Sequence, residues 1–193
     1  MARTKDFDEE EVLNKAMNLF WDKGYAGTSM QDLVDGLGIS RSSLYDTFGD
    51  KHSLFIRVLE NYRQYAGKQM SELIANSPSA KATVRTMLEN NINELIKDKQ
   101  HKGCFLVNTS VEMAAHDPEV SAMLCDNDSQ VEQYFYEAIS KGQESGELSQ
   151  QKDARALARF ILNAIKGIRV TAKSVSDKKM FEDIISLTMS VLD

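Results

Sequence analysis

Residues 28–51 read TSMQDLVDGLGISRSSLYDTFGDK, and this stretch predicts two short helices joined by a tight glycine turn. Thr28 is a favourable N-cap for the first helix, and Gln31, three residues later, can complete a capping box. Gly36-Leu37-Gly38 ends that helix, because glycine readily takes the left-handed conformation of a helix terminus. Ser40 then caps the second helix. The stretch is therefore predicted to be a helix-turn-helix, whose second helix lies in the DNA major groove.

The second predicted helix has one apolar face and one polar face. Leu44, Tyr45 and Phe48 recur at helical spacing and can pack against the first helix. The other side chains are small or polar and can reach bases or phosphates. For base reading we expect Arg41, Ser42, Ser43 and Asp46. For phosphate binding we expect Thr28, Ser29, Tyr45, Thr47 and Lys51, with Arg3 and Lys5 along the minor groove if that arm orders.

The amino-acid sequence of residues 8–56 resembles that of the DNA-binding domain of the TetR family of bacterial repressors. The motifs that carry the resemblance are Gly24-Tyr25, Thr28-Ser29-Met30, Gly38-Ile39-Ser40, Leu44-Tyr45, Phe48, Lys51 and Leu54. The resemblance implies an all-α fold of about nine helices. It implies a three-helix DNA-binding domain at residues 1–50 and a helical ligand-binding and dimerisation domain at residues 51–193. Ser42 and Asp46 depart from the residues frequent in the family, so the operator sequence cannot be taken from a relative.

Length and composition agree with a helical globular protein. The 193 residues are 42% hydrophobic and include only two prolines and ten glycines. No stretch approaches the roughly 20 apolar residues of a membrane-spanning helix. The first residues contain no apolar segment typical of a secretory signal. Two cysteines are too few for a disulfide framework, so we expect a reduced, cytoplasmic protein.

The charge of the chain is unusual for a protein that binds nucleic acid. The formal net charge is −6, and residues 1–60 contain seven Lys and Arg against eleven Asp and Glu. Several of these acids, Asp8 to Glu11, fall in the first turn of a predicted helix, where they favour the helix dipole. We therefore expect weak non-specific DNA binding with strong salt dependence.

Helix start and stop signals divide the chain into successive helices. Asp8 can cap a helix that ends near Gly24, and Asp117-Pro118 opens another that runs to Gly146. The other predicted helices span residues 50–75, a segment that begins at Ser77-Pro78, and residues 104–115, 153–174 and 179–192.

The last two predicted helices are candidates for a dimer interface. The helix at 153–174, which includes Ile165, is apolar around more of its circumference than a surface helix needs. One interpretation is a pair of interior helices in a monomer. The family resemblance instead favours a four-helix homodimer interface. A two-fold dimer presents two reading helices, so the operator should be a palindrome.

The resemblance also implies a ligand pocket whose occupation reorients the two reading heads. Aromatic and methionine side chains suit an apolar small molecule, and amides can orient it. Most of the candidate residues are equally compatible with plain core packing, and the sequence does not identify the inducer. The candidates are Met87, Asn91, Cys104, Phe105, Asn108, Glu112, Met113, Tyr134 and Asn163.

Cys104 supports three readings. It follows His101-Lys102-Gly103 at a predicted helix start, where a cation and the helix terminus favour the reactive thiolate. The sequence block resembles that of some family members, a few of which respond to electrophiles. Cys104 is therefore a candidate redox or electrophile sensor, a pocket residue or an inert core residue.

No catalytic, metal or cofactor constellation is recognisable in the sequence. His52, His101 and His116 lie far apart, and no His, Cys and carboxylate set has metal-ligand spacing. The preferred interpretation is a repressor released by a small molecule. A catalytic helical bundle and a protein-binding adaptor remain alternatives, and specific retardation of a palindromic DNA fragment would separate the repressor from both.

Overall fold

The computed structural model describes residues 7–98 and 100–193, without the side chains of residues 94–97. Within that part the chain forms nine helices and no strand, which confirms the predicted all-α class. None of its helices combines the length and apolar content needed to cross a membrane. The helices are α1 (Glu9–Gly27), α2 (Met30–Leu37), α3 (Arg41–Phe48), α4 (Lys51–Ala75), α5 (Ala80–Lys97), α6 (Phe105–Met113), α7 (Pro118–Glu144), α8 (Ala154–Thr171) and α9 (Lys178–Ser190).

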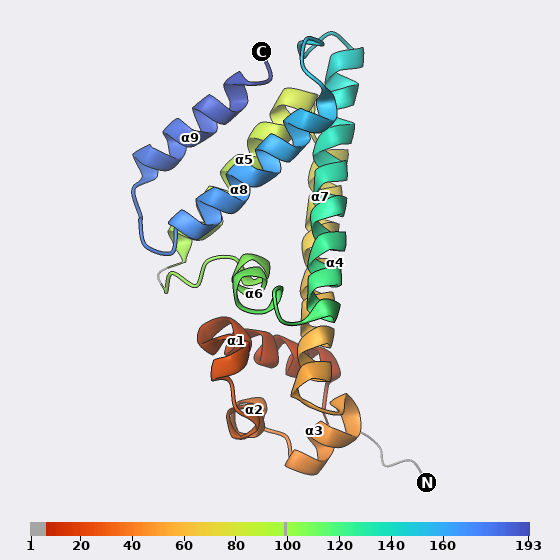
Figure 1. The fold of residues 1–193 in the computed structure, drawn as a ribbon, viewed down its shortest axis with the longest axis vertical. Coiled ribbons are helices and arrows are strands. Elements are labelled where there is room, and N and C mark those ends of the chain that lie inside the picture. Colours follow the sequence, from red (N-terminus) through yellow and green to blue (C-terminus); the bar gives the residue numbers. More distant parts are fainter. Residues whose placement is uncertain (1–6, 99) are drawn as a thin grey trace.

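Figure 1 shows how the helices are arranged. The first three form a small head at one end of the molecule, and α6 lies directly against α1. The long helix α4 leaves the head and runs beside α7. The helices α5, α7, α8 and α9 form the body, and α9 packs on α5 and α8.

Most predicted helix starts coincide with side-chain caps. The carboxylate of Asp8 accepts from the backbone N–H groups of Glu10 and Glu11, and Asp117 likewise caps α7 with Pro118 at the first position. The predicted start of α5 at Ser77-Pro78 is wrong by two residues. The helix begins at Ala80.

The start of α5 depends on a contact from a distant loop. The carboxylate of Glu147, in the connection from α7 to α8, accepts from Ala80 N at 2.9 Å and Lys81 N at 2.8 Å. The hydroxyl of Ser79 accepts from Ala82 N. These oxygens satisfy the first backbone N–H groups of the helix, which therefore begins two residues after Pro78. The local sequence could not indicate the contact with Glu147, because that residue lies far along the chain.

Two apolar clusters form the interior. The amino-terminal cluster joins α1–α3 and the first half of α4 with buried residues of α6 and α7, including Phe105, Met113 and Leu124. The rings of Phe20 and Phe55 lie 4.9 Å apart between centroids, and Phe55 and Phe105 lie 5.9 Å apart. The second cluster lies within α5, α7, α8 and α9. Because α6 contributes to the core of the head, a movement of α6 must disturb the packing of the head.

Candidate nucleic-acid interface and ligand cavity

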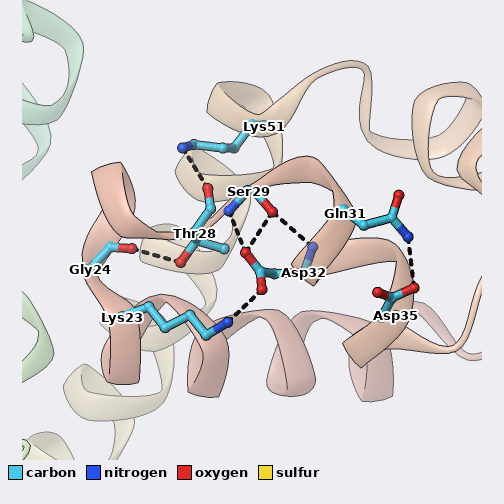
Figure 2. Close-up of polar contacts among 8 residues, drawn as sticks. All are labelled: Lys23, Gly24, Thr28, Ser29, Gln31, Asp32, Asp35 and Lys51. Carbon is cyan, nitrogen blue, oxygen red and sulfur yellow. Dashed lines mark hydrogen bonds and ion pairs between the residues drawn. The ribbon is translucent and has the colours of Figure 1, made fainter.

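The start of α2 differs from the sequence prediction in its capping residues. Ser29, not Thr28, is the N-cap: its hydroxyl accepts from Asp32 N at 3.0 Å, and the Asp32 carboxylate accepts from Ser29 N at 2.8 Å (Figure 2). Gln31 instead donates to Asp35 along the helix. The Asp32 pKa is held well below its usual range, first by the hydrogen bond from Lys23 and then by those from Ser29.

Thr28 is turned into the protein rather than toward a ligand. The residue is 0% exposed, and its hydroxyl donates to the carbonyl oxygen of Gly24 at 2.7 Å (Figure 2). The prediction that its side chain holds a phosphate is therefore corrected, because the hydroxyl is buried and already bonded. Ser29, the next residue, is exposed.

The turn between α2 and α3 has the predicted chemistry. Gly38 adopts φ 69° and ψ 25°, the left-handed conformation that glycine takes without steric cost. Ser40 caps α3 by accepting from Ser43 N at 3.1 Å. Leu37 and Leu44 are buried on either side of the turn, so the two helices are held in one rigid unit.

The outer face of α3 presents the residues that were expected to read bases. Arg41, Ser42 and Asp46 are exposed, and Ser43 is half-buried with its hydroxyl 2.8 Å from that of Ser40. Of the expected phosphate contacts on this helix, Tyr45 is 45% exposed and Thr47 is half-buried. The face is polar and open to solvent, and the base and phosphate assignments remain predictions.

Lys51 has a structural role that the sequence did not indicate. Its ammonium donates to the carbonyl oxygens of Tyr25 and Thr28, both at 2.7 Å, and lies 4.3 Å from the centre of the Tyr25 ring. Figure 2 shows the bond to Thr28. Lys51 thus joins the start of α4 to the turn between α1 and α2, and a DNA phosphate would have to share this ammonium with the two carbonyl groups.

Most of the described basic residues of the head form ion pairs with nearby carboxylates. Lys15 pairs with Glu11, and Arg57 pairs with Glu9, each at 2.7 Å. Lys23 pairs with Asp32. Arg41 stands exposed at the start of α3, while the predicted minor-groove residues Arg3 and Lys5 lie outside the described residues. Arg41 therefore has no ion-pair partner among the described residues and is open to solvent, and its role in DNA binding stays a prediction.

A cavity of about 290 Å³ lies among α4, α5, α6, α7 and α8, and we refer to it as the central cavity. Two predicted ligand residues, Asn91 and Tyr134, line it. Its apolar wall includes Met70, Leu106, Val107, Val131, Leu162 and Ile165. Its charged residues, which no sequence motif indicated, are Arg63, Asp128, Lys166 and Arg169.

The other predicted ligand residues do not line the central cavity. Met87 and Met113 are buried core residues. Asn163 is exposed on α8. Cys104 lines a separate hollow of about 230 Å³. A further hollow between α1 and α6 is lined by Phe105, Asn108 and Glu112. The nine candidates are therefore divided between the central cavity, separate hollows, the core and the surface, because they lie on different sides of their helices.

An exposed stripe runs along α8 and α9. On α8 it contains Phe160, Gly167 and Val170, with Phe160 and Val170 each 51% exposed. On α9 it contains Leu187, which is 71% exposed, four residues from half-buried Val191. Ile165, predicted to lie on the interface, is instead buried within the monomer.

Fold and surface together define a helix-turn-helix DNA-binding protein whose head packs against a helical body. The model of the bacterial regulatory proteins of the tetR family matches residues 12–58, and that of the tetracyclin repressor-like C-terminal domain matches residues 80–187. The chain belongs to the TetR family of DNA-binding transcriptional regulators.

Individual relatives agree with this assignment along the whole chain. An uncharacterised HTH-type regulator of Bacillus subtilis strain 168, YezE, is 34% identical over 100% of both chains. The HTH-type transcriptional repressor ComR of Escherichia coli K12 is 27% identical over 97% of this chain and 90% of its own. A cysteine-substituted TetR family regulator, CifR, solved with 26-bp operator DNA, superposes with a TM-score of 0.88 at 26% identity, covering 99% of this chain and 100% of that one.

Proposed function

We propose that the protein is a homodimeric repressor that binds a palindromic operator and is released when a small molecule occupies the central cavity. The observation that carries the proposal is the double role of α6. Leu106, Val107, Ser110 and Val111 of this helix line the cavity, while Phe105 and Met113 belong to the core of the head. A ligand that displaces α6 would therefore act on the reading helices through packed side chains.

Two polar contacts support the same coupling. Glu112 of α6 accepts from Tyr25 N at 3.0 Å and Ala26 N at 2.8 Å, just after α1 breaks at Gly24 with φ 74°. His52, near the start of α4, lies 2.7 Å from the carboxylate of Asp117 at the start of α7. The head thus forms hydrogen bonds with α6 and with the start of α7, and both of these helices border the central cavity.

The stripe on α8 and α9 supports dimerisation. Large apolar side chains such as Phe160 and Leu187 lie exposed on neighbouring helices, and exposed apolar patches of this kind are typical of protein–protein interfaces. A Cβ built at Gly167 would meet nothing within 4 Å in the monomer, so no internal contact requires glycine there. Glycine in mid-helix costs stability relative to alanine, and close approach of a partner helix supplies a reason for it. A two-fold axis at this stripe would present two α3 helices to operator DNA in the cytoplasm.

Chemical modification of Cys104 is the alternative route to release. The residue is the N-cap of α6, and it shares its hollow with Lys102 and Arg169. Its side chain is only 6% exposed within the amino-terminal cluster, which favours the role of a small apolar residue. A comparison of wild type with Cys104→Ser separates a sensor from a core residue, with operator release by peroxide and by a quinone as the measurement. Equal release, or none, removes Cys104 from the mechanism.

Selection from a random pool of duplex DNA tests the central proposal. The full-length protein should enrich an inverted repeat, because each protomer reads one half-site. Arg41→Ala should abolish or shift the enrichment, whereas Arg85→Ala, on the exposed side of α5, should leave the consensus unchanged. Enrichment of a single half-site would refute the palindrome. Absence of any enrichment would favour the adaptor or, with turnover of a compound, the enzyme.

A further inference from the structure

The charges around the central cavity are unbalanced. Its described lining contains three cations, Arg63, Lys166 and Arg169, and one carboxylate, Asp128. Lys166 is paired with Asp128 across α7 and α8. The two arginines therefore face the cavity without a carboxylate of the lining left to neutralise them.

Arg63 contains an unsatisfied donor. Its Nε is buried, and among the described residues it has no hydrogen-bond partner. Guanidinium groups keep their charge under all physiological conditions, so this donor cannot be relieved by losing a proton. Buried donors without partners are rare in folded proteins, and a role in binding a ligand is a physical reason to retain one.

Among the described residues, the hydrogen bonds of Arg169 go to a neutral group. Its Nε donates to Oδ1 of Asn91 at 2.8 Å, and one Nη donates to the same oxygen. Two donors of the planar guanidinium thus converge on one amide oxygen, although their geometry matches the two oxygens of a carboxylate. A ligand carboxylate could replace Asn91 here and form a stronger, charge-assisted pair.

The rest of the wall indicates the shape of such a ligand. The rest of the lining supplies apolar surface from Met70, Leu106, Val131, Leu162 and the rings of Tyr62 and Tyr134. The volume of about 290 Å³ is near the lower end of the range, roughly 300–1,000 Å³, found for small-molecule sites. A compact apolar body with one anionic group fits both features.

We infer that the central cavity binds a small organic carboxylate, whose anionic group is held by Arg63 and Arg169 and whose apolar body lies against α4, α6 and α7. The inference rests on the proposed function in one respect, since it takes this cavity as the inducer site. It goes further by naming the chemical class of the ligand and the residues that select it.

Matched pairs of ligands test the class directly. Calorimetric titration of the full-length protein, without DNA, should compare aromatic and alkyl carboxylic acids with their primary amides, for example 2-naphthoate with 2-naphthamide and decanoate with decanamide. The paired compounds have nearly the same shape and differ in charge. We expect the acids to bind about tenfold or more tightly than the amides, because only they form charge-assisted bonds. Equal binding, preference for the amides, or no binding of any acid would overturn the inference.

Substitutions then test the two residues. Arg169→Gln and Arg63→Gln should each weaken acid binding by about tenfold and leave amide binding within about twofold. Arg85→Gln, which removes an exposed arginine from α5, is the matched control and should change neither. Unchanged acid affinity in both cavity variants would show that the arginines do not hold the ligand.

A second substitution of Arg63 separates a role in ligand binding from a role in stability, because the two properties should change in opposite directions. Arg63→Met removes a buried donor without a partner, so the free protein should become more heat-stable while acid affinity falls. A loss of both stability and affinity would indicate a purely structural residue. Operator DNA is added last: acids that bind without releasing DNA would refute the proposed mode of release but leave the ligand class standing.

Discussion

Glu112 offers a measurable test of the link between α6 and the reading head. Its carboxylate accepts two backbone N–H groups, from Tyr25 at 3.0 Å and Ala26 at 2.8 Å, in the manner of a helix cap supplied by another helix. Side-chain caps of this kind contribute about 0.5–2 kcal/mol. We take about 1.5 kcal/mol for Glu112→Ala, since two donors lose a charged acceptor but regain water at an exposed site.

That loss converts to a change in melting temperature. For a chain of this size, 1 kcal/mol corresponds to about 2–4 °C, so Glu112→Ala should melt roughly 3–6 °C below wild type. Protein concentration must be held constant, because the melting temperature of a dimer depends on it. Glu89→Ala is the control, since this exposed glutamate pairs with Arg85 one helical turn away, and such pairs contribute little to stability.

The same variant should alter regulation. Ligand affinity measured without DNA should stay near that of wild type, because Glu112 does not line the central cavity. The weakening of operator binding by saturating ligand should become smaller, because a polar link from α6 to the head is gone. A melting temperature equal to that of Glu89→Ala, together with an unchanged ligand response, would refute the argument that this contact couples the two parts.

The remaining predictions concern the dimer, the reading helix and acid stability. Leu187→Asp should convert dimer to monomer in sedimentation at micromolar concentration, whereas Tyr65→Asp, an equally exposed position on α4, should not; a monomeric wild type would end the interface proposal. Asp46→Ala should change the selected base preference by about 1–3 kcal/mol at one position, and an unaltered consensus removes Asp46 from the reading set. Backbone N–H groups, chiefly those of Val120 and Lys81, hold the pKa values of Asp117 and Glu147 below their ordinary range. The contribution of these two carboxylates to stability is therefore complete above the unfolded pKa of about 4 and is lost as pH falls through the lower folded pKa. The urea concentration at the unfolding midpoint should therefore decrease when the pH is lowered below about 4, and it should decrease less in Glu147→Gln.

Local sequence predicted the elements whose stabilising contacts are themselves local. Asp8, Ser40 and Asp117 cap helices through bonds to residues two or three positions away, and Gly38 needs only its own backbone to turn the chain. Such interactions can be inferred from spacing alone, so the helix order and the helix-turn-helix were predicted. The capping box of α2 was misplaced by one residue, because Thr28 and Ser29 are chemically equivalent caps until burial distinguishes them.

The tertiary structure alone assembled the cavity and the links between its parts. Arg63 and Arg169 come from helices about a hundred residues apart, and on each helix taken separately a charged residue is typical of a solvated face. Lys51 and Glu112 likewise look like free charges until their partners, the carbonyl and N–H groups near Gly24, are brought beside them. The sequence by itself determined the family, the order of the helices and the polar face of α3, because caps, turns and helical periodicity act over a few residues. Which side chains meet in the cavity depended on the packing of five helices, where contacts are set by distance in space and not by separation along the chain.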